Sequence, residues 1–174
     1  MMRLGFLLLC VVYVFHTLLY NFLNDDAYIS FRYAQNLAVH GELTYNLGER
    51  VEGYTNFLWT VLIALVLALG GEIEFWSKAL GILAGVATFD CLFRFFRDDL
   101  DKPIAGLLSI LLLCISPSFS CWSTGGLEVM LFTFFLTGGA IALSRECLSE
   151  KEVRSTCWFA LAALTRPEGL IAFG

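Results

Sequence analysis

The chain has 174 residues, of which 58% are apolar and only 16% are charged. Soluble domains carry about 25% charged residues, so this composition excludes an ordinary soluble fold. The formal net charge of −5 argues against nucleic acid as a partner, because affinity for nucleic acid comes largely from basic patches. The composition therefore indicates a membrane protein whose immediate partner is lipid.

The apolar residues form long uninterrupted runs rather than the narrow stripe of a soluble helix. A helix that rises about 1.5 Å per residue needs roughly 18 or more apolar residues to cross a bilayer core of about 30 Å. The first run is longer than the core of a signal peptide, and no A-x-A-like site follows it, so we interpret it as a retained helix. The runs cover residues 4–23, 57–69, 75–96, 103–120, 127–143 and 155–174.

Charge decides which runs cross the membrane. If all of them crossed, with Arg3 in the cytoplasm, the basic clusters within 94–102 and 145–154 would lie outside, against the positive-inside rule. If the short run 57–69 does not cross, both clusters fall inside. We therefore predict an all-α membrane protein with about five transmembrane helices, a cytoplasmic N-terminus and a long first external loop, 24–74. The predicted spans lie near residues 4–23, 75–96, 103–120, 127–144 and 154–174.

The external loop should contain helices that lie at the membrane interface. Residues 27–39 have apolar side chains at helical spacing, and Asp25 and Asp26 come just before them, where carboxylates favour a helix N-terminus. Residues 43–52 are polar and irregular. The run 57–69 is short for a span and is typical of an interfacial or re-entrant helix.

Under this topology, ionisable residues from three parts of the sequence reach the outer surface of the membrane. They are the Asp25-Asp26 pair, Glu128 at the outer end of the fourth span, and Arg166 with Glu168 in the outer part of the fifth. Ionisable groups at membrane depth are costly, so they indicate a functional site by default. The sequence thus predicts a polar pocket on the extracytoplasmic face.

Such a pocket suits transfer from a phosphate-activated, membrane-embedded donor. A carboxylate can act as general base toward an acceptor hydroxyl, and an arginine can hold a phosphate bidentately. No cofactor is required by the pattern; if a divalent cation is used, Asp25 and Asp26 are the ligands it would take. Each residue also has a structural alternative: helix capping for the aspartates, a helix-dipole contact for Glu128, and a mutual ion pair for Arg166 and Glu168.

Four sequence segments carry a resemblance to a known family. They are DDAYISFRYAQNL at 25–37, NLGERVEGYTNFLW at 46–59, GGLE at 125–128 and LTRPEG at 164–169. In this order the segments resemble bacterial C-type (GT-C) membrane glycosyltransferases, most closely the group of mycobacterial terminal arabinofuranosyltransferases. The resemblance covers nearly the whole chain.

The resemblance implies an enzyme of the bacterial inner (plasma) membrane that transfers a sugar from a polyprenyl-phosphate donor. The acceptor would be a glycan or lipid of the cell envelope outside the cytoplasm. By the same resemblance Asp25 is the expected general base and Asp26 its partner, and Arg166 contacts the donor phosphate. Glu128 and Glu168 would shape the pocket. The weaker candidates for sugar contacts are Tyr54 and Asn56.

One departure from the family pattern and two alternative functions accompany this expectation. Members of the family carry more spans and often a C-terminal external domain, so we expect 1–174 to be the N-terminal part of a GT-C transmembrane domain. The main alternative is a non-catalytic multi-pass membrane protein, such as a transporter subunit or an inactive fragment. A transporter would be expected to place polar residues near the bilayer midplane. A third alternative is another enzyme acting on lipid phosphates, which shares the pocket chemistry but not the resemblance of 49–59.

Overall fold

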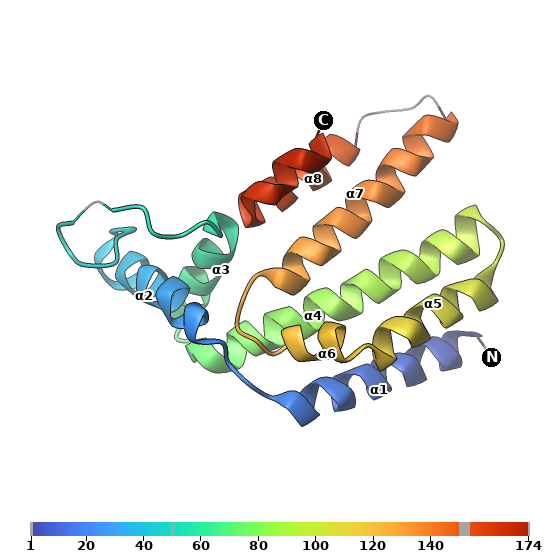
Figure 1. Ribbon diagram of the computed structural model, residues 1–174, viewed down its shortest axis with the longest axis horizontal. Coiled ribbons are helices and arrows are strands. Elements are labelled where there is room, and N and C mark those ends of the chain that lie inside the picture. Colours follow the sequence, from blue (N-terminus) through green and yellow to red (C-terminus); the bar gives the residue numbers. More distant parts are fainter. Residues whose placement is uncertain (1, 50, 150–153, 174) are drawn as a thin grey trace.

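The computed structural model describes residues 2–49, 51–149 and 154–173, and within these ranges the regular structure is helical, with no strand (Figure 1). Helices are expected throughout, because a chain in lipid must satisfy its backbone hydrogen bonds within each segment. In chain order the elements are α1 (Met2–Tyr20), α2 (Asp25–His40), α3 (Phe57–Ala68), α4 (Ile73–Arg94), a π-helical extension of α4 (Phe95–Asp99), α5 (Pro103–Ile115), α6 (Pro117–Trp122), α7 (Val129–Ser149), α8 (Ser155–Thr165) and the 3₁₀ helix η2 (Pro167–Phe173).

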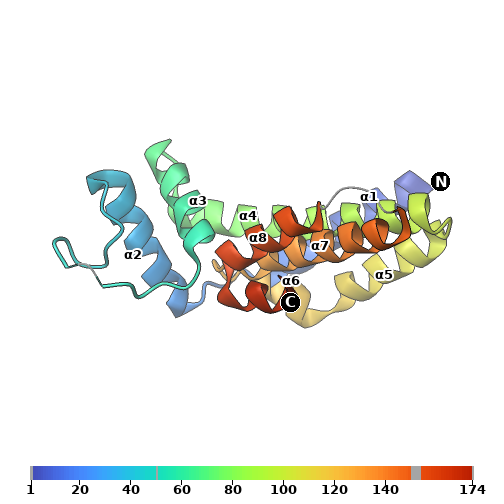
Figure 2. The same ribbon diagram turned by 90° about the horizontal axis from the view of Figure 1, so that it is seen from above.

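The helices α1, α4, α5, α7 and α8 lie side by side as an elongated bundle, and α2 and α3 project beyond one end of it (Figures 1 and 2). Among the described residues, three helical segments are long and apolar enough to cross a membrane: Met2–Tyr20, Ile73–Asp99 and Val129–Cys147. The apolar helices α3, α5 and α8 are shorter. The all-helical membrane class predicted from the sequence agrees with this architecture.

The surface of α1 has the character of a lipid-facing helix. Only Tyr13 and Thr17 are buried, and most of the large apolar side chains on the rest of the helix are exposed. In water such a surface would be strongly unfavourable, whereas hydrocarbon chains solvate it well. The exposed side chains are Leu4, Leu7, Leu8, Val11, Val12, Phe15, Leu18 and Leu19.

The end of the bundle opposite α2 and α3 holds most of the basic residues. The Arg145 guanidinium on α7 donates to Asp99 Oδ2 at 2.7 Å, which joins the ends of α7 and of the π-helical extension of α4. Glu146 accepts hydrogen bonds from the backbone N–H of Arg154 and, at 2.7 Å, from that of Ser155, which joins α7 to the start of α8. The described residues of the two basic clusters noted in the sequence therefore lie at one end of the molecule (Figure 1).

The helices α2 and α3 form a small domain-like unit with its own apolar core. Ala27, Phe31 and Ala34 of α2 pack against Trp59 and Ile63 of α3, and all of them are buried. Leu127 and Leu131, at the start of α7, pack against this core. The predicted helices at 27–39 and 57–69 are thus both present, and burial of their shared face fixes them against the end of the bundle.

Two of the predicted spans are not single helices. The run 103–120 divides at Ser116 into α5 and α6, and the run 154–174 divides at Arg166 into α8 and η2. In each case a proline follows the break; proline lacks a backbone N–H and disfavours helical geometry in the residue before it. Arg166 is accordingly extended, with φ −151° and ψ 139°. The predicted span 154–174 is therefore not one continuous helix over its described residues, because η2 turns back and packs along α8 (Figure 1).

The start of α2 also differs from the prediction. Asp25 and Asp26 form its first turn instead of preceding it, and the N-cap is Asn24, whose Oδ1 accepts from the backbone N–H of Asp26 at 2.8 Å. The helix ends at Gly41, which takes the left-handed conformation with φ 72°. Capping by Asn24 leaves both aspartate side chains free of the capping role that the sequence allowed them.

Close packing inside the bundle depends on two glycines one turn apart on α4. A Cβ on Gly81 would collide with the backbone oxygen of Ser123, and one on Gly85 with the hydroxyl of Tyr13. Tyr13 and Ser123 are themselves hydrogen-bonded, with 2.6 Å between their hydroxyl oxygens. Small residues spaced in this way let helix backbones approach one another, a frequent device in membrane proteins.

We expect Gly81→Ala to lower the free energy of unfolding by about 1–3 kcal/mol, because the backbone atom that it meets cannot rotate away. Gly5→Ala on α1 is the matched control: its Cβ would make an ordinary contact of 3.5 Å with Leu107. Since alanine is the better helix former, the control should be neutral or slightly stabilising. Thermal unfolding in detergent, followed by circular dichroism, compares the two; equal midpoints would contradict this packing.

Candidate functional site

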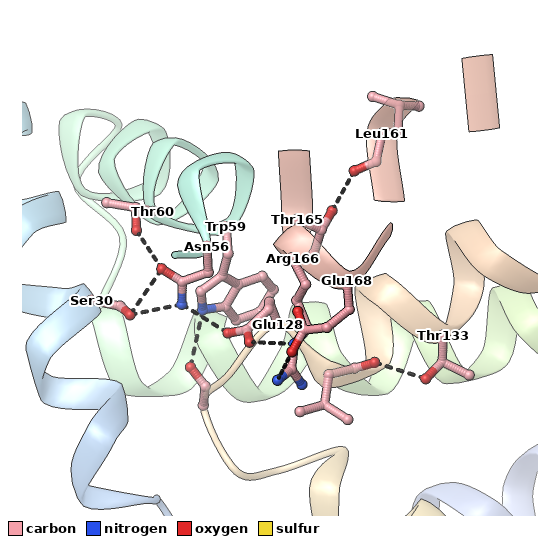
Figure 3. Close-up of polar contacts among 12 residues, drawn as sticks. Ser30, Asn56, Trp59, Thr60, Glu128, Thr133, Leu161, Thr165, Arg166 and Glu168 are labelled. Carbon is pink, nitrogen blue, oxygen red and sulfur yellow. Dashed lines mark hydrogen bonds and ion pairs between the residues drawn. The ribbon is translucent and has the colours of Figure 1, made fainter. Parts of the chain in front are cut away.

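The site is centred on Glu128, a carboxylate that is only 7% exposed at the N-terminal end of α7. Asn56 Nδ2 donates to Glu128 Oε2 at 2.8 Å, and Arg166 Nε lies 3.7 Å from Glu128 Oε1 (Figure 3). A buried carboxylate needs donors and a compensating positive charge, and these two side chains supply both. Glu128 therefore joins residues that are 72 and 38 positions away in the sequence.

Asn56 is buried at the start of α3, and both the nitrogen and the oxygen of its side-chain amide make hydrogen bonds. Its Nδ2 donates to Ser30 Oγ at 2.9 Å as well as to Glu128, and its Oδ1 accepts from Thr60 Oγ1 at 3.1 Å (Figure 3). These partners come from α2, α3 and α7. Asn56 is thus the central connector of the site, and its amide hydrogens are already committed within the protein.

The backbone carbonyls of the loop between α6 and α7 accept hydrogen bonds from Trp59 of α3 and from Asn24, the N-cap of α2. The indole Nε1 of Trp59 donates to the carbonyl of Gly126 at 3.1 Å, and the backbone N–H of Asn24 donates to the carbonyl of Gly125 at 3.0 Å. Gly126 has φ 78°, and a Cβ there would press against Leu23. Only glycine adopts this conformation at low cost, so the close approach of the loop to α2 requires it.

Arg166 lies between two carboxylates and above an aromatic ring. Its Nη2 donates to Glu168 Oε1 at 3.2 Å, in addition to the contact with Glu128, and its guanidinium carbon is 5.8 Å from the centre of the Phe132 ring. The side chain of Arg166 is 35% exposed. The predicted residues Glu128, Arg166 and Glu168 are therefore brought together, and the arginine charge is balanced by acidic neighbours.

Asp25 and Asp26 lie beside this group rather than within it. Both are exposed on the first turn of α2, one and two residues after the Asn24–Gly125 backbone contact. That contact holds the start of α2 on the loop that leads into Glu128. The aspartates consequently share one end of the molecule with Glu128 and Arg166, and their carboxylates face the surroundings.

Tyr54 occupies a different place from Asn56, although only two residues separate them. Its ring is half-buried against Tyr33 of α2, with the ring centres 4.9 Å apart. Partial burial, the nearby Glu52 carboxylate and Tyr33 raise the pKa of the Tyr54 phenol. Tyr54 faces a depression in the segment between α2 and α3, away from Glu128.

Three residues that hold the site together were not expected from the sequence to make polar contacts: Ser30, Trp59 and Thr60. Ser30 carried a usable signal, because it stands three residues after the buried Ala27 and so belongs to the inward face of α2. Trp59 and Thr60 lay inside an apolar run, where nothing in the sequence marks a polar partner. In the part of the chain that the structure describes, no three acidic, histidine or cysteine side chains gather as a possible metal site.

Comparison of the chain with protein-family models, with curated proteins and with solved structures finds no match.

Proposed function

We propose that the protein is a membrane glycosyltransferase of the C type, or the N-terminal part of one. It would transfer a sugar from a polyprenyl-phosphate donor to a cell-envelope acceptor outside the cytoplasm. The observation that carries the proposal is the contact network of Asn56, Glu128 and Arg166. Each of these residues belongs to a separate segment of the family resemblance. The side chains of Asn56 and Arg166 both contact the buried carboxylate of Glu128.

The proposed topology follows from the arrangement of charges. With the basic end of the bundle in the cytoplasm, as the positive-inside rule favours, α2 and α3 lie on the extracytoplasmic side as interfacial helices. In this proposal α5 continues into α6 to form one of the about five spans. The last span would be contributed by α8, which packs against α7 but at 11 residues does not cross the membrane alone. The exposed apolar side chains of α5, among them Ile104, Leu108 and Leu112, favour contact with lipid.

In this proposal Asp25 is the general base. A base must reach the proton that it removes, and an exposed carboxylate on a fixed helix end can approach an acceptor hydroxyl. Asp26 would orient the acceptor or, with Asp25, hold a divalent cation through oxygen ligands. The N-terminal turn of α2 is also a favourable place for negatively charged side chains.

Arg166 would contact the donor phosphate through the edge of its guanidinium that faces the surroundings. Because Glu128 and Glu168 already balance its charge, the arginine is held in position before the donor arrives. Glu128 would thus position Arg166, and Glu168, the more exposed of the two, could exchange its contact for one with the phosphate. These roles make Glu128 a positioning residue and not a reacting group.

The experiment that tests the proposal is sugar transfer in membranes that contain the protein. Radiolabelled polyprenyl-phosphate sugars, including the arabinofuranosyl donor, are supplied with envelope acceptor, and labelled product is counted against membranes without the protein. Transfer with inversion at the anomeric carbon would support the proposal. Absence of transfer from every donor, with the protein folded, would favour the non-catalytic alternative.

A further inference from the structure

The mostly apolar helix α1 carries three polar side chains at helical spacing: Tyr13, His16 and Thr17. Tyr13 and Thr17 are buried, and His16 is half-buried. Thr17 donates its hydroxyl hydrogen to the carbonyl of Val14 in α1 itself, whereas Tyr13 and His16 reach other parts of the bundle. Polar and ionisable side chains inside a membrane are costly, and the proposed reaction assigns no role to Tyr13 or His16.

His16 contacts the chain where α5 breaks into α6. Its Nδ1 atom lies 2.7 Å from the carbonyl oxygen of Cys114 and 2.9 Å from Ser120 Oγ. A carbonyl oxygen only accepts hydrogen bonds, so Nδ1 carries the hydrogen. Because α5 ends at Ile115, the Cys114 carbonyl has lost the backbone donor that a continuous helix would supply four residues later. His16 replaces that donor, which is needed because an unsatisfied carbonyl is costly in lipid.

Tyr13 makes a second contact, with the residue that follows α6. Its hydroxyl oxygen lies 2.6 Å from Ser123 Oγ, and both residues are buried. The Ser123 hydroxyl itself donates to the carbonyl of Phe119 at 2.7 Å, so the hydrogen between the two hydroxyl oxygens comes from Tyr13. His16 and Tyr13 therefore hold α6 against α1, His16 at the break before α6 and Tyr13 directly after it (Figure 1).

The short loop that follows α6, residues 123–128, belongs to the candidate site. Its Gly125 carbonyl accepts the hydrogen bond from the N-cap of α2, the residue directly before Asp25. Its last residue, Glu128, contacts Arg166. The loop therefore connects the proposed general base with the proposed phosphate contact. Because Tyr13 holds the first residue of this loop, α1 fixes where the loop begins.

We propose that Tyr13 and His16 are positioning residues that set the distance between Asp25 and Arg166; this inference rests on the proposed function. The helix α1 acts on both sides of the site, because its polar side chains hold α6 while its chain continues directly into α2. Loss of either hydrogen bond would let the start of the loop 123–128 shift relative to α2. A displacement of about 1 Å between reacting groups can lower a rate about a hundredfold.

The test measures this distance without any transfer. Spin labels are attached through p-acetylphenylalanine in place of Ile29 on α2 and Leu170 on η2, both exposed and neither assigned a role in the reaction. Double electron–electron resonance is then recorded in lipid nanodiscs. We expect His16→Leu to shift or broaden the distance distribution. His16→Asn should preserve it, because the asparagine amide nitrogen is attached to Cγ as Nδ1 is and also donates a hydrogen bond.

A second variant and a control separate positioning from stability. Tyr13→Phe removes one hydroxyl and keeps the ring, so it should fold and change the distance distribution in the same direction as His16→Leu. Phe15→Leu is the matched control: this neighbour on α1 is 66% exposed, and the distribution should stay as it is in the unaltered protein. A lowered unfolding temperature in His16→Leu and Tyr13→Phe, with an unchanged distribution, would overturn the proposal, because the two hydrogen bonds would then only stabilise the bundle.

Sugar transfer provides the second readout, and the two readouts fail separately. With His16→Leu we expect kcat to fall about 10- to 100-fold and the KM for the donor to change little, because the contacts of Arg166 are retained. His16→Asn should recover most of the loss. Altered distances in a protein whose unaltered form transfers no sugar would support the positioning geometry and contradict the proposed reaction. Full kcat in both His16→Leu and Tyr13→Phe would contradict the positioning role and leave the reaction untouched.

Discussion

Replacement of Arg166 by methionine should lower the free energy of unfolding by about 3 kcal/mol, at the lower end of the range for breaking a buried ion pair. The reason is that Glu128, only 7% exposed, would keep a single described donor, Asn56 Nδ2, and no compensating positive charge. Methionine retains the unbranched stem of arginine, so packing near Phe132 is largely preserved. Chemical unfolding in detergent gives the free energy.

A double-mutant cycle isolates the charge. In the Arg166→Met background, Glu128→Gln should restore most of the lost stability, because a neutral amide does not need the arginine. Glu168→Gln is the control: this partner of Arg166 is 56% exposed, and its replacement should change the free energy of unfolding far less. If the effects of the two replacements at 128 and 166 simply add, the ion pair does not stabilise the site.

The second large effect concerns Asp25. If it is the general base, Asp25→Asn should reduce sugar transfer about 10²- to 10⁴-fold, because asparagine cannot take up the acceptor proton. Stability should hardly change, since Asp25 is exposed and the helix cap is supplied by Asn24. The measurement is transfer in membranes with matched amounts of folded protein.

Asp26→Asn provides the neighbouring comparison. It has the same exposure and the same place in the first turn of α2, so it controls for the loss of one negative charge at the helix N-terminus. We expect a smaller reduction than for Asp25→Asn. Full transfer by Asp25→Asn together with loss in Asp26→Asn would assign the base to Asp26 instead.

The sequence predicted that Glu128 and Arg166 belong to one site, but it did not predict the role of Asn56 between them. Charge counting brought Glu128 and Arg166 to one surface, because the positive-inside rule relates segments far apart in the chain. It could not show that Asn56 joins them: Asn56 was expected to contact sugar, whereas its amide is occupied by Ser30, Thr60 and Glu128. Pairing of buried polar groups depends on tertiary approach, which local sequence patterns do not encode.

The proline breaks illustrate a different limit. Pro167 was recognised as a helix interruption, yet the span was still expected to continue through it, because prolines are tolerated inside many membrane helices. The extended conformation of Arg166 decides otherwise, since it turns the chain back along α8. The same turn brings Arg166 to Glu128. The break at Arg166 therefore explains both why the predicted span is not one helix and how the site is assembled.

The segment between α2 and α3 shows another limit of sequence patterns. Residues 43–52 were interpreted as polar and irregular, which the structure confirms for those that it describes. The sequence did not indicate how this segment is held, which depends on hydrogen bonds from Tyr33 and Asn36 of α2 to its backbone carbonyls.

The central claim is that segments far apart in the sequence build one site on the extracytoplasmic surface of the membrane. Labelling of intact cells with a membrane-impermeant maleimide tests it most directly. The reporters are a Glu49→Cys thiol in the exposed segment between α2 and α3 and the native, exposed Cys147 near the end of α7. The other exposed thiol, Cys157, is replaced by serine and the half-buried Cys121 by alanine. If α2 and α3 lie outside, only the Glu49→Cys thiol should react in intact cells. Cys147 should react only after the cells are permeabilised. Labelling of Cys147 from outside, with the Glu49→Cys thiol protected, would contradict it.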